Sequence, residues 1–146
     1  MRRTVLLLAV PAVLVLAACG PQDHAIGDTV RISDGDLTVT AIEQGTAADV
    51  ADLELDDLEG QTPYFIRYEV DLNDGADGID ESRWQGSATS GDVTAINVIQ
   101  IGDGFDCTGL GEIVDGEAEG CQLVMAEDGA TLEWVAFGGA GRWVTD

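Results

Sequence analysis

The segment Phe65-Ile66-Arg67-Tyr68-Glu69-Val70-Asp71-Leu72 decides the fold class, because apolar and charged side chains alternate along it. Successive side chains of a β-strand point to opposite faces of its sheet. The predicted inward set is Ile66, Tyr68, Val70 and Leu72, and the predicted outward set is Arg67, Glu69 and Asp71. This pattern is typical of a half-buried strand in an antiparallel sheet, with one face on the core and the other in water.

Short segments on either side also carry strand signals, and glycine-containing turns separate them. The predicted strands span residues 29–32, 37–42, 64–72, 93–101, 121–125 and 132–137. In the second of these, Leu37, Val39 and Ala41 share one face, so that side of the strand can be buried. Asp-Gly pairs at 34–35, 74–75, 103–104 and 128–129 are predicted to supply the positive φ of tight turns.

Helical periodicity is confined to residues 46–59, where Val50, Leu53 and Leu58 could line one face of a helix. Six acidic residues crowd the same stretch, and like charges three and four apart weaken an isolated helix. We predict an exposed loop with at most one helical turn. Many short strands with almost no helix predict an all-β sandwich or barrel, and residues 28–146 suit one domain.

The order of these segments resembles a known family. An opening at 26–30, a strand at 37–39, an acidic loop, a central strand at 64–70 and closing strands at 120–125 and 132–134 resemble the telokin-like, immunoglobulin-like domains of many exported bacterial lipoproteins. The resemblance covers nearly the whole mature domain and implies an immunoglobulin-like antiparallel β-sandwich, whose role in that family is mostly unassigned. Asn73 occupies the polar position expected after the central strand, whereas residues 75–91 depart from the pattern.

The N-terminal residues predict export from the cytoplasm and attachment to the membrane. Arg2 and Arg3 precede an apolar run at 5–18, which fits the plan of an export signal and is too short to span a bilayer. Leu16-Ala17-Ala18-Cys19 resembles the lipobox of bacterial lipoproteins, which implies cleavage before Cys19 and its modification with lipid such as palmitate. Two or more acyl chains would anchor the chain stably on the extracytoplasmic side of the cell membrane. The alternative is an ordinary secretory signal with an incidental cysteine.

The predicted division of the chain is a signal peptide at 1–18, a lipidated cysteine and tether at 19–27, and a β-sandwich domain at 28–146. In an exported protein, Cys107 and Cys121 are expected to form a disulfide. Closing a loop of about 15 residues would stabilise the fold by roughly 3 kcal/mol. Two free buried thiols are the alternative.

Charge narrows the range of partners. The mature chain carries 28 acidic residues and four arginines, a formal charge of −24 (4 minus 28), and the sequence has no lysine. Nucleic acid and anionic lipid headgroups are therefore not expected as partners. Such a surface keeps a monomer soluble and attracts cations or basic partners.

Two acidic runs are candidates for binding a cation, and Ca²⁺ is the cofactor that they suggest. The first candidate set is Asp71, Asn73, Asp74, Asp77, Asp80 and Glu81. Its spacing departs from a calcium loop, because Gly75 and Trp84 fall where ligands belong. The second run, Glu112, Asp115, Glu117 and Glu119, lies inside the predicted disulfide loop. For both runs the alternative is a solvated surface.

Aromatic side chains supply a different kind of candidate. Trp84 and Trp143 lie outside the predicted strands, which makes them candidates for recognition of a sugar or a protein. The alternative is that both cap the open ends of the sandwich. Trp134 alternates with Leu132 and Ala136 and is predicted to be buried.

No catalytic residue is predicted, because the single histidine, His24, lies in the tether and there is no lysine to act as a base. The predicted function is a non-catalytic, lipid-anchored interaction module with a partner in the cell envelope. One alternative is a cation-dependent or ligand-binding accessory lipoprotein of a transport system. Another is a small hydrolase that uses paired carboxylates.

Overall fold

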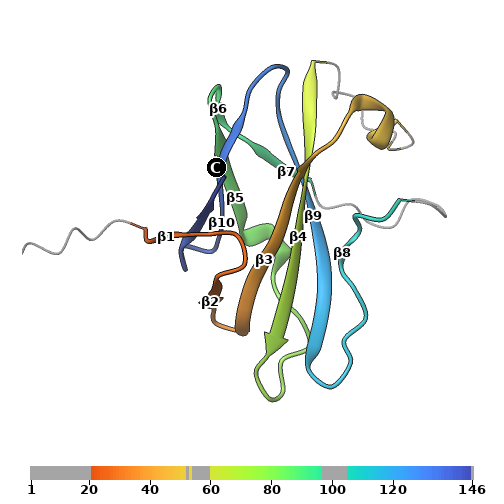
Figure 1. Cartoon of the computed structure of the whole chain (residues 1–146). Helices are drawn as coiled ribbons and strands as arrows, with labels where there is room; N and C mark the ends of the chain where they lie inside the picture. The colour runs from red at the N-terminus through yellow and green to blue at the C-terminus, as the bar shows by residue number, and fades with distance from the viewer. Residues whose placement is uncertain (1–20, 52, 54–59, 97–104, 146) are drawn as a thin grey trace, which may run out of the picture.

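Two β-sheets packed face to face make up the described part of the chain, residues 21–51, 53, 60–96 and 105–145 of this computed structural model (Figure 1). The predicted all-β class and the two-sheet sandwich are confirmed. The signal segment 1–18 and Cys19 lie outside the described residues. No helix among the described residues is long and apolar enough to cross a membrane.

The larger sheet is antiparallel and has the order β2-β3-β4-β9-β7, with β8 also paired to β9. Its strands are β2 (Thr29–Arg31), β3 (Gly35–Gln44), β4 (Gln61–Leu72), β7 (Thr94–Ile96), β8 (Gly109–Leu110) and β9 (Glu117–Glu127). These include the predicted strands at 29–32, 37–42, 64–72 and 121–125. The predicted strand at 93–101 is confirmed for Thr94–Ile96, Val93 precedes the strand, and residues 97–101 lie outside the described residues.

The smaller sheet has the order β1-β11-β10-β5-β6. Its strands are β1 (Asp23–His24), β5 (Trp84–Ala88), β6 (Gly91–Asp92), β10 (Leu132–Phe137) and β11 (Arg142–Val144). Of these, only β10 was predicted. Gly86 and Ser87 lower the strand propensity of β5, and β1, β6 and β11 are too short to show alternation. All pairs are antiparallel except β1 with β11, which is parallel.

The parallel pairing of β1 corrects the predicted boundary of the tether. Asp23 and His24 pair with Arg142 and Trp143, so they belong to the sandwich and not to a free linker. Gln22 is fastened as well, because its carbonyl oxygen accepts a hydrogen bond from the backbone N–H of Arg142 at 3.0 Å. The contact joins residues about 120 positions apart, which local sequence patterns do not encode.

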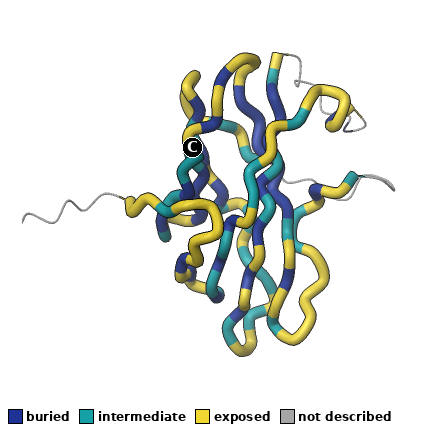
Figure 2. The backbone as a smooth tube through the Cα atoms, in the orientation of Figure 1, coloured by how far each residue is buried: buried dark blue, intermediate teal, exposed yellow. Residues whose placement is uncertain are grey.

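The core lies between the two sheets (Figure 2). The inward set predicted for the central strand is confirmed, since Ile66, Tyr68, Val70 and Leu72 are all buried. Aromatic rings from the smaller sheet pack against them. The Trp84 ring centroid lies 5.2 Å from that of Tyr68 and 5.2 Å from that of Phe137.

Two β-bulges overturn predictions that rested on strict alternation. A bulge between Val39 and Ala41 places Ala41 opposite the outward-facing Arg67, so Ala41 does not continue the buried face. A second bulge, between Leu132 and Trp134, turns Trp134 away from the core and leaves it half-exposed. One extra residue in a strand reverses the facing of every later side chain, which is why both predictions were wrong.

The turns and the loop at 46–59 follow their predictions in part. Gly75 and Gly129 have positive φ, 85° and 77°. Gly35 does not, and it is required instead because a Cβ there would collide with the backbone oxygen of Asp71. The loop forms one 3₁₀ turn, η1 (Ala47–Val50), and a second 3₁₀ turn, η2 (Glu81–Arg83), precedes β5.

A second, smaller core covers part of the outer face of the larger sheet. Val50 and Leu53 bury themselves against Leu123 and Met125 of β9. The predicted disulfide between Cys107 and Cys121, with an S–S distance of 1.97 Å, belongs to the same cluster. It ties the segment before β8 onto β9, so this disulfide lies on the outer face and not between the sheets.

Candidate functional site

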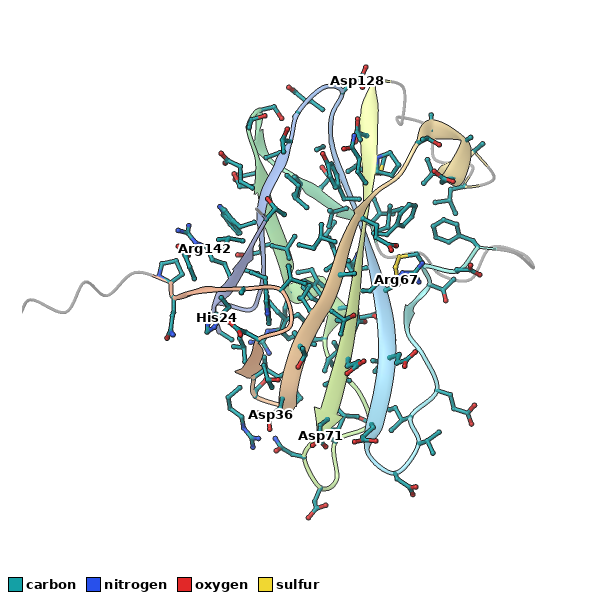
Figure 3. All side chains as sticks on the ribbon, in the orientation of Figure 1. His24, Asp36, Arg67, Asp71, Asp128 and Arg142 are labelled. Carbon is teal, nitrogen blue, oxygen red and sulfur yellow. A yellow bond between two sulfur atoms is a disulfide. The ribbon has the colours of Figure 1, made fainter. Side chains whose placement is uncertain are left out.

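A groove of about 1020 Å³ lies on the outer face of the larger sheet. Outward side chains of β3, β4 and β9 form its floor, and residues from the segment 106–115 form one wall. Figure 3 labels Asp36, Arg67 and Asp71 along this floor. The alternation of β4 accounts for the floor, because the residues between the buried Ile66, Tyr68, Val70 and Leu72 must face outward.

Two rows of carboxylates cross the floor of the groove. Asp71 on β4 lies between its register partners, Asp36 on β3 and Glu117 on β9. One outward position along β4, Glu69 lies directly opposite Glu119 on β9. Side chains at directly opposite positions have Cβ atoms about 4.5–5.5 Å apart, and like charges there destabilise a sheet.

Four of these residues, Glu69, Asp71, Glu117 and Glu119, are called the carboxylate block below. None of the four makes a side-chain hydrogen bond or an ion pair with another described residue. Asp36 is paired with Arg31 at 2.9 Å. Arg67, the one basic residue among the described residues that line the groove, is paired with Glu43 at 3.7 Å. The block therefore has no ion-pair partner in the described part of the chain, and its net charge is strongly negative.

The wall of the groove is fastened at three places. The disulfide holds Cys107 against β9, and the backbone N–H of Gly111 donates to the carbonyl of Glu119 at 2.8 Å. Between them, the Glu81 carboxylate accepts hydrogen bonds from the backbone N–H of Leu110 and from the Tyr68 hydroxyl, the latter at 2.9 Å. These contacts hold the segment 106–115 beside the sheet.

The Tyr68 hydroxyl acts only as a hydrogen-bond donor to Glu81, which holds the wall of the groove. Burial of the side chain, and after it the negative charge of Glu81, raise the pKa of Tyr68 far above its ordinary range. The phenol therefore stays protonated and donates to Glu81. Glu81 is thus a structural acceptor, although the sequence suggested it as a cation ligand.

The structure does not bring the first predicted cation set together. Asp71 lies in the groove, whereas Asn73 accepts a hydrogen bond from Arg31 at 2.6 Å and donates to the Ser33 carbonyl. Asp80 accepts from the backbone N–H and hydroxyl of Ser82, which hold its pKa below its usual range. Asp74 and Asp77 are exposed. Across the described residues, no group of three or more His, Cys, Asp or Glu side chains is arranged to hold a metal ion.

The second acidic run contributes more to the site than the first. Glu112, Asp115, Glu117 and Glu119 all line the groove, two from its wall side and two from β9. Sequence reasoning missed Asp36 and Glu69 as site residues. Alternation along the strands predicts that both side chains face outward. The register that sets Glu69 opposite Glu119 is a long-range pairing, which alternation does not predict.

The tryptophans are placed differently from the recognition prediction. Trp84 and Trp143 are 3% and 0% exposed, so neither is available to an external partner, and that prediction is corrected. They belong to β5 and β11, strands that the sequence did not reveal. His24 packs beside Trp143, with ring centroids 6.2 Å apart.

Comparison of the chain with protein-family models, with curated proteins and with solved structures found no match. An open sheet face that carries the carboxylate block attracts cations and basic groups. Its carboxylates are spread along two strands, which suits several separate positive charges better than one central ion.

Proposed function

We propose that this protein is a non-catalytic, lipid-anchored interaction module on the extracytoplasmic side of the cell membrane, and that its groove binds a basic segment of an envelope protein. The observation that carries the proposal is the carboxylate block, four adjacent carboxylates without a positive partner among the described residues. Each like-charge pair on neighbouring strands destabilises the sheet, and arginine or lysine side chains of a partner would offset that cost.

The groove fits an extended basic segment better than a compact ligand. Its carboxylates follow β4 and β9 at alternate positions, so they repeat along the strand direction. A partner with basic side chains at a similar spacing can place one charge beside each row. The overall acidic charge adds long-range attraction, which raises the rate of association with a basic partner at low salt.

Export and anchoring are supported by two separate features. The charged start, the apolar run and Cys19 have the plan of a lipoprotein signal. The disulfide between Cys107 and Cys121 suits an oxidising compartment outside the cytoplasm. Both features support a location in which the groove can meet proteins of the cell envelope.

A non-catalytic role is supported by the position of His24, which is paired in β1 and packed beside Trp143, away from the groove. The immunoglobulin-like character of the sandwich is likewise proposed. Its support is the two packed sheets, mostly antiparallel, with Trp84 in the core between them. The disulfide departs from the immunoglobulin pattern, in which such a bond joins the two sheets.

Binding of an oligoarginine peptide tests the groove. The protein extracted from membranes in detergent is titrated with the labelled peptide, and binding is followed by fluorescence anisotropy. The groove variant is Glu69→Gln with Glu119→Gln, and the matched control is Glu127→Gln with Glu133→Gln, two exposed carboxylates that do not line the groove. Both variants remove the same charge. Loss of two exposed ion pairs should weaken binding by about two- to thirtyfold. Equal weakening in both variants would show that the groove has no special part.

Lipid attachment is tested separately. Mass spectrometry of the N-terminal peptide of the full chain should show acylation at Cys19, and Cys19→Ser should release the protein from the membrane fraction. An unmodified Cys19 in a membrane-free protein would refute the anchor while leaving the groove assay valid.

A further inference from the structure

The outer face of the smaller sheet contrasts with the acidic groove. Register partners identify the outward positions of β5, β10 and β11 as Gln85, Ser87, Trp134, Ala136, Arg142 and Val144. None of these six described positions carries a carboxylate. The carboxylates of this sheet are Glu133 at the bulge and Asp23 and Asp92 on the two edge strands. The centre of this face is therefore free of carboxylates, unlike the floor of the groove, and the exposed Glu133 lies beside Trp134.

Trp134 and Arg142 lie side by side on the face of the smaller sheet. The guanidinium carbon of Arg142 lies 5.6 Å from the centroid of the half-exposed Trp134 ring. Tryptophan side chains gather at membrane–water interfaces, where the ring body is apolar and its N–H remains wet. Arg142 is paired with Asp23, so these two charges balance and the centre of the face is repelled less by a lipid surface than the groove is. The face thus combines an interfacial tryptophan with a balanced ion pair, which suits a layer of lipid headgroups.

The start of the fold lies on the same side of the molecule. β1 is the edge strand of the smaller sheet, and Arg142 forms an ion pair with Asp23 at its beginning. In Figure 1, β1 and the smaller sheet lie on the left and β8 and β9 on the right. In Figure 3, Arg142 and His24 lie on the left and Arg67 of the groove on the right.

The tether is too short to let the domain turn freely. Gln22 is already bonded to the backbone of Arg142, and Cys19 precedes it by three residues. Three residues span at most about 10–11 Å when fully extended. The Debye length at physiological ionic strength is about 8 Å, so charges on the near side of the domain interact with the membrane surface. An acidic groove turned toward anionic lipid would be repelled at that distance.

We infer that the outer face of the smaller sheet, centred on Trp134 and Arg142, lies against the lipid headgroups and that the groove points away from the membrane. This inference rests on the lipidation of Cys19 proposed above. The whole chain is too acidic to bind anionic lipid by charge alone, so the anchor supplies the attachment and the faces supply the orientation. The groove is then open to envelope partners.

Tryptophan quenching in vesicles tests the orientation. The full chain is extracted and reconstituted into phosphatidylcholine–phosphatidylglycerol vesicles with a nitroxide on the headgroup of a tracer lipid. Trp84 and Trp143 are buried and give a common background in every variant. Most of the quenching should disappear in Trp134→Phe. Thr40→Trp, which places a tryptophan at an exposed position lining the groove, should add fluorescence that the nitroxide does not quench.

The mass of the Cys19 peptide is measured on the same samples, so the two proposals can fail separately. An acylated protein in which Trp134→Phe leaves quenching unchanged, or in which Thr40→Trp is the more strongly quenched position, would overturn the orientation alone. A protein without acylation at Cys19 would overturn both. Thr40→Trp keeps Trp134 and the core intact, so it provides a reading even if Trp134→Phe does not fold.

Discussion

Glu69→Gln should stabilise the protein, because Glu69 lies directly opposite Glu119 and has no positive partner among the described residues. With Cβ atoms about 5 Å apart in water, two like charges repel by about 0.5–1 kcal/mol. Repulsion from Asp71 and Glu117 is weaker and is partly balanced by attraction to Arg67. For a domain of this size, the change corresponds to a rise in melting temperature of about 2–4 °C.

The assay is a thermal melt of the oxidised protein at low and at high salt. The gain should shrink at about 1 M salt, where the Debye length is about 3 Å. Glu127→Gln is the matched control, since Glu127 lies on the same two paired strands but opposite the neutral Gln61. The reasoning is refuted if Glu69→Gln gives no gain at low salt, or if the control gains as much.

Three further outcomes are expected. Replacing Cys107 and Cys121 by alanine should lower the free energy of unfolding by about 3 kcal/mol, because their bond joins residues 14 positions apart. Denaturant unfolding measures this change, and a loss near zero would mean that the bond hardly constrains the unfolded chain. Asp23→Asn should lower the melting temperature at neutral pH. The hydrogen bond from Arg142 lowers the pKa of Asp23 in the folded protein. The stability that Asp23 contributes is therefore present above its pKa in the unfolded chain and is lost as the pH falls through its pKa in the folded protein. The difference in melting temperature between wild type and variant should close in acid, and a difference that persists there would contradict this assignment. Calcium and magnesium should raise the melting temperature equally and slightly, by screening, because the predicted ligands within residues 71–81 do not converge; a rise specific to calcium would restore the cation-dependent alternative.

The fold class could be predicted from the sequence because alternation is a local signal. Ile66, Tyr68, Val70 and Leu72 are buried as their spacing indicated, and the position of β10 was predicted correctly. The disulfide followed from counting, because only two cysteines remain if Cys19 carries lipid. These predictions needed only composition and the two-residue period of a strand.

The site depended on contacts that no local pattern contains. The carboxylate block exists because the register of β4 against β9 sets Glu69 opposite Glu119, across about 50 residues of chain. The bulge before Trp134 reversed its facing, and the pairing of β1 with β11 drew Asp23 into the fold. The sequence by itself determined which side chains can alternate between core and water. The tertiary structure decided which of the outward ones meet, because strand register is fixed by the packing of the whole sheet.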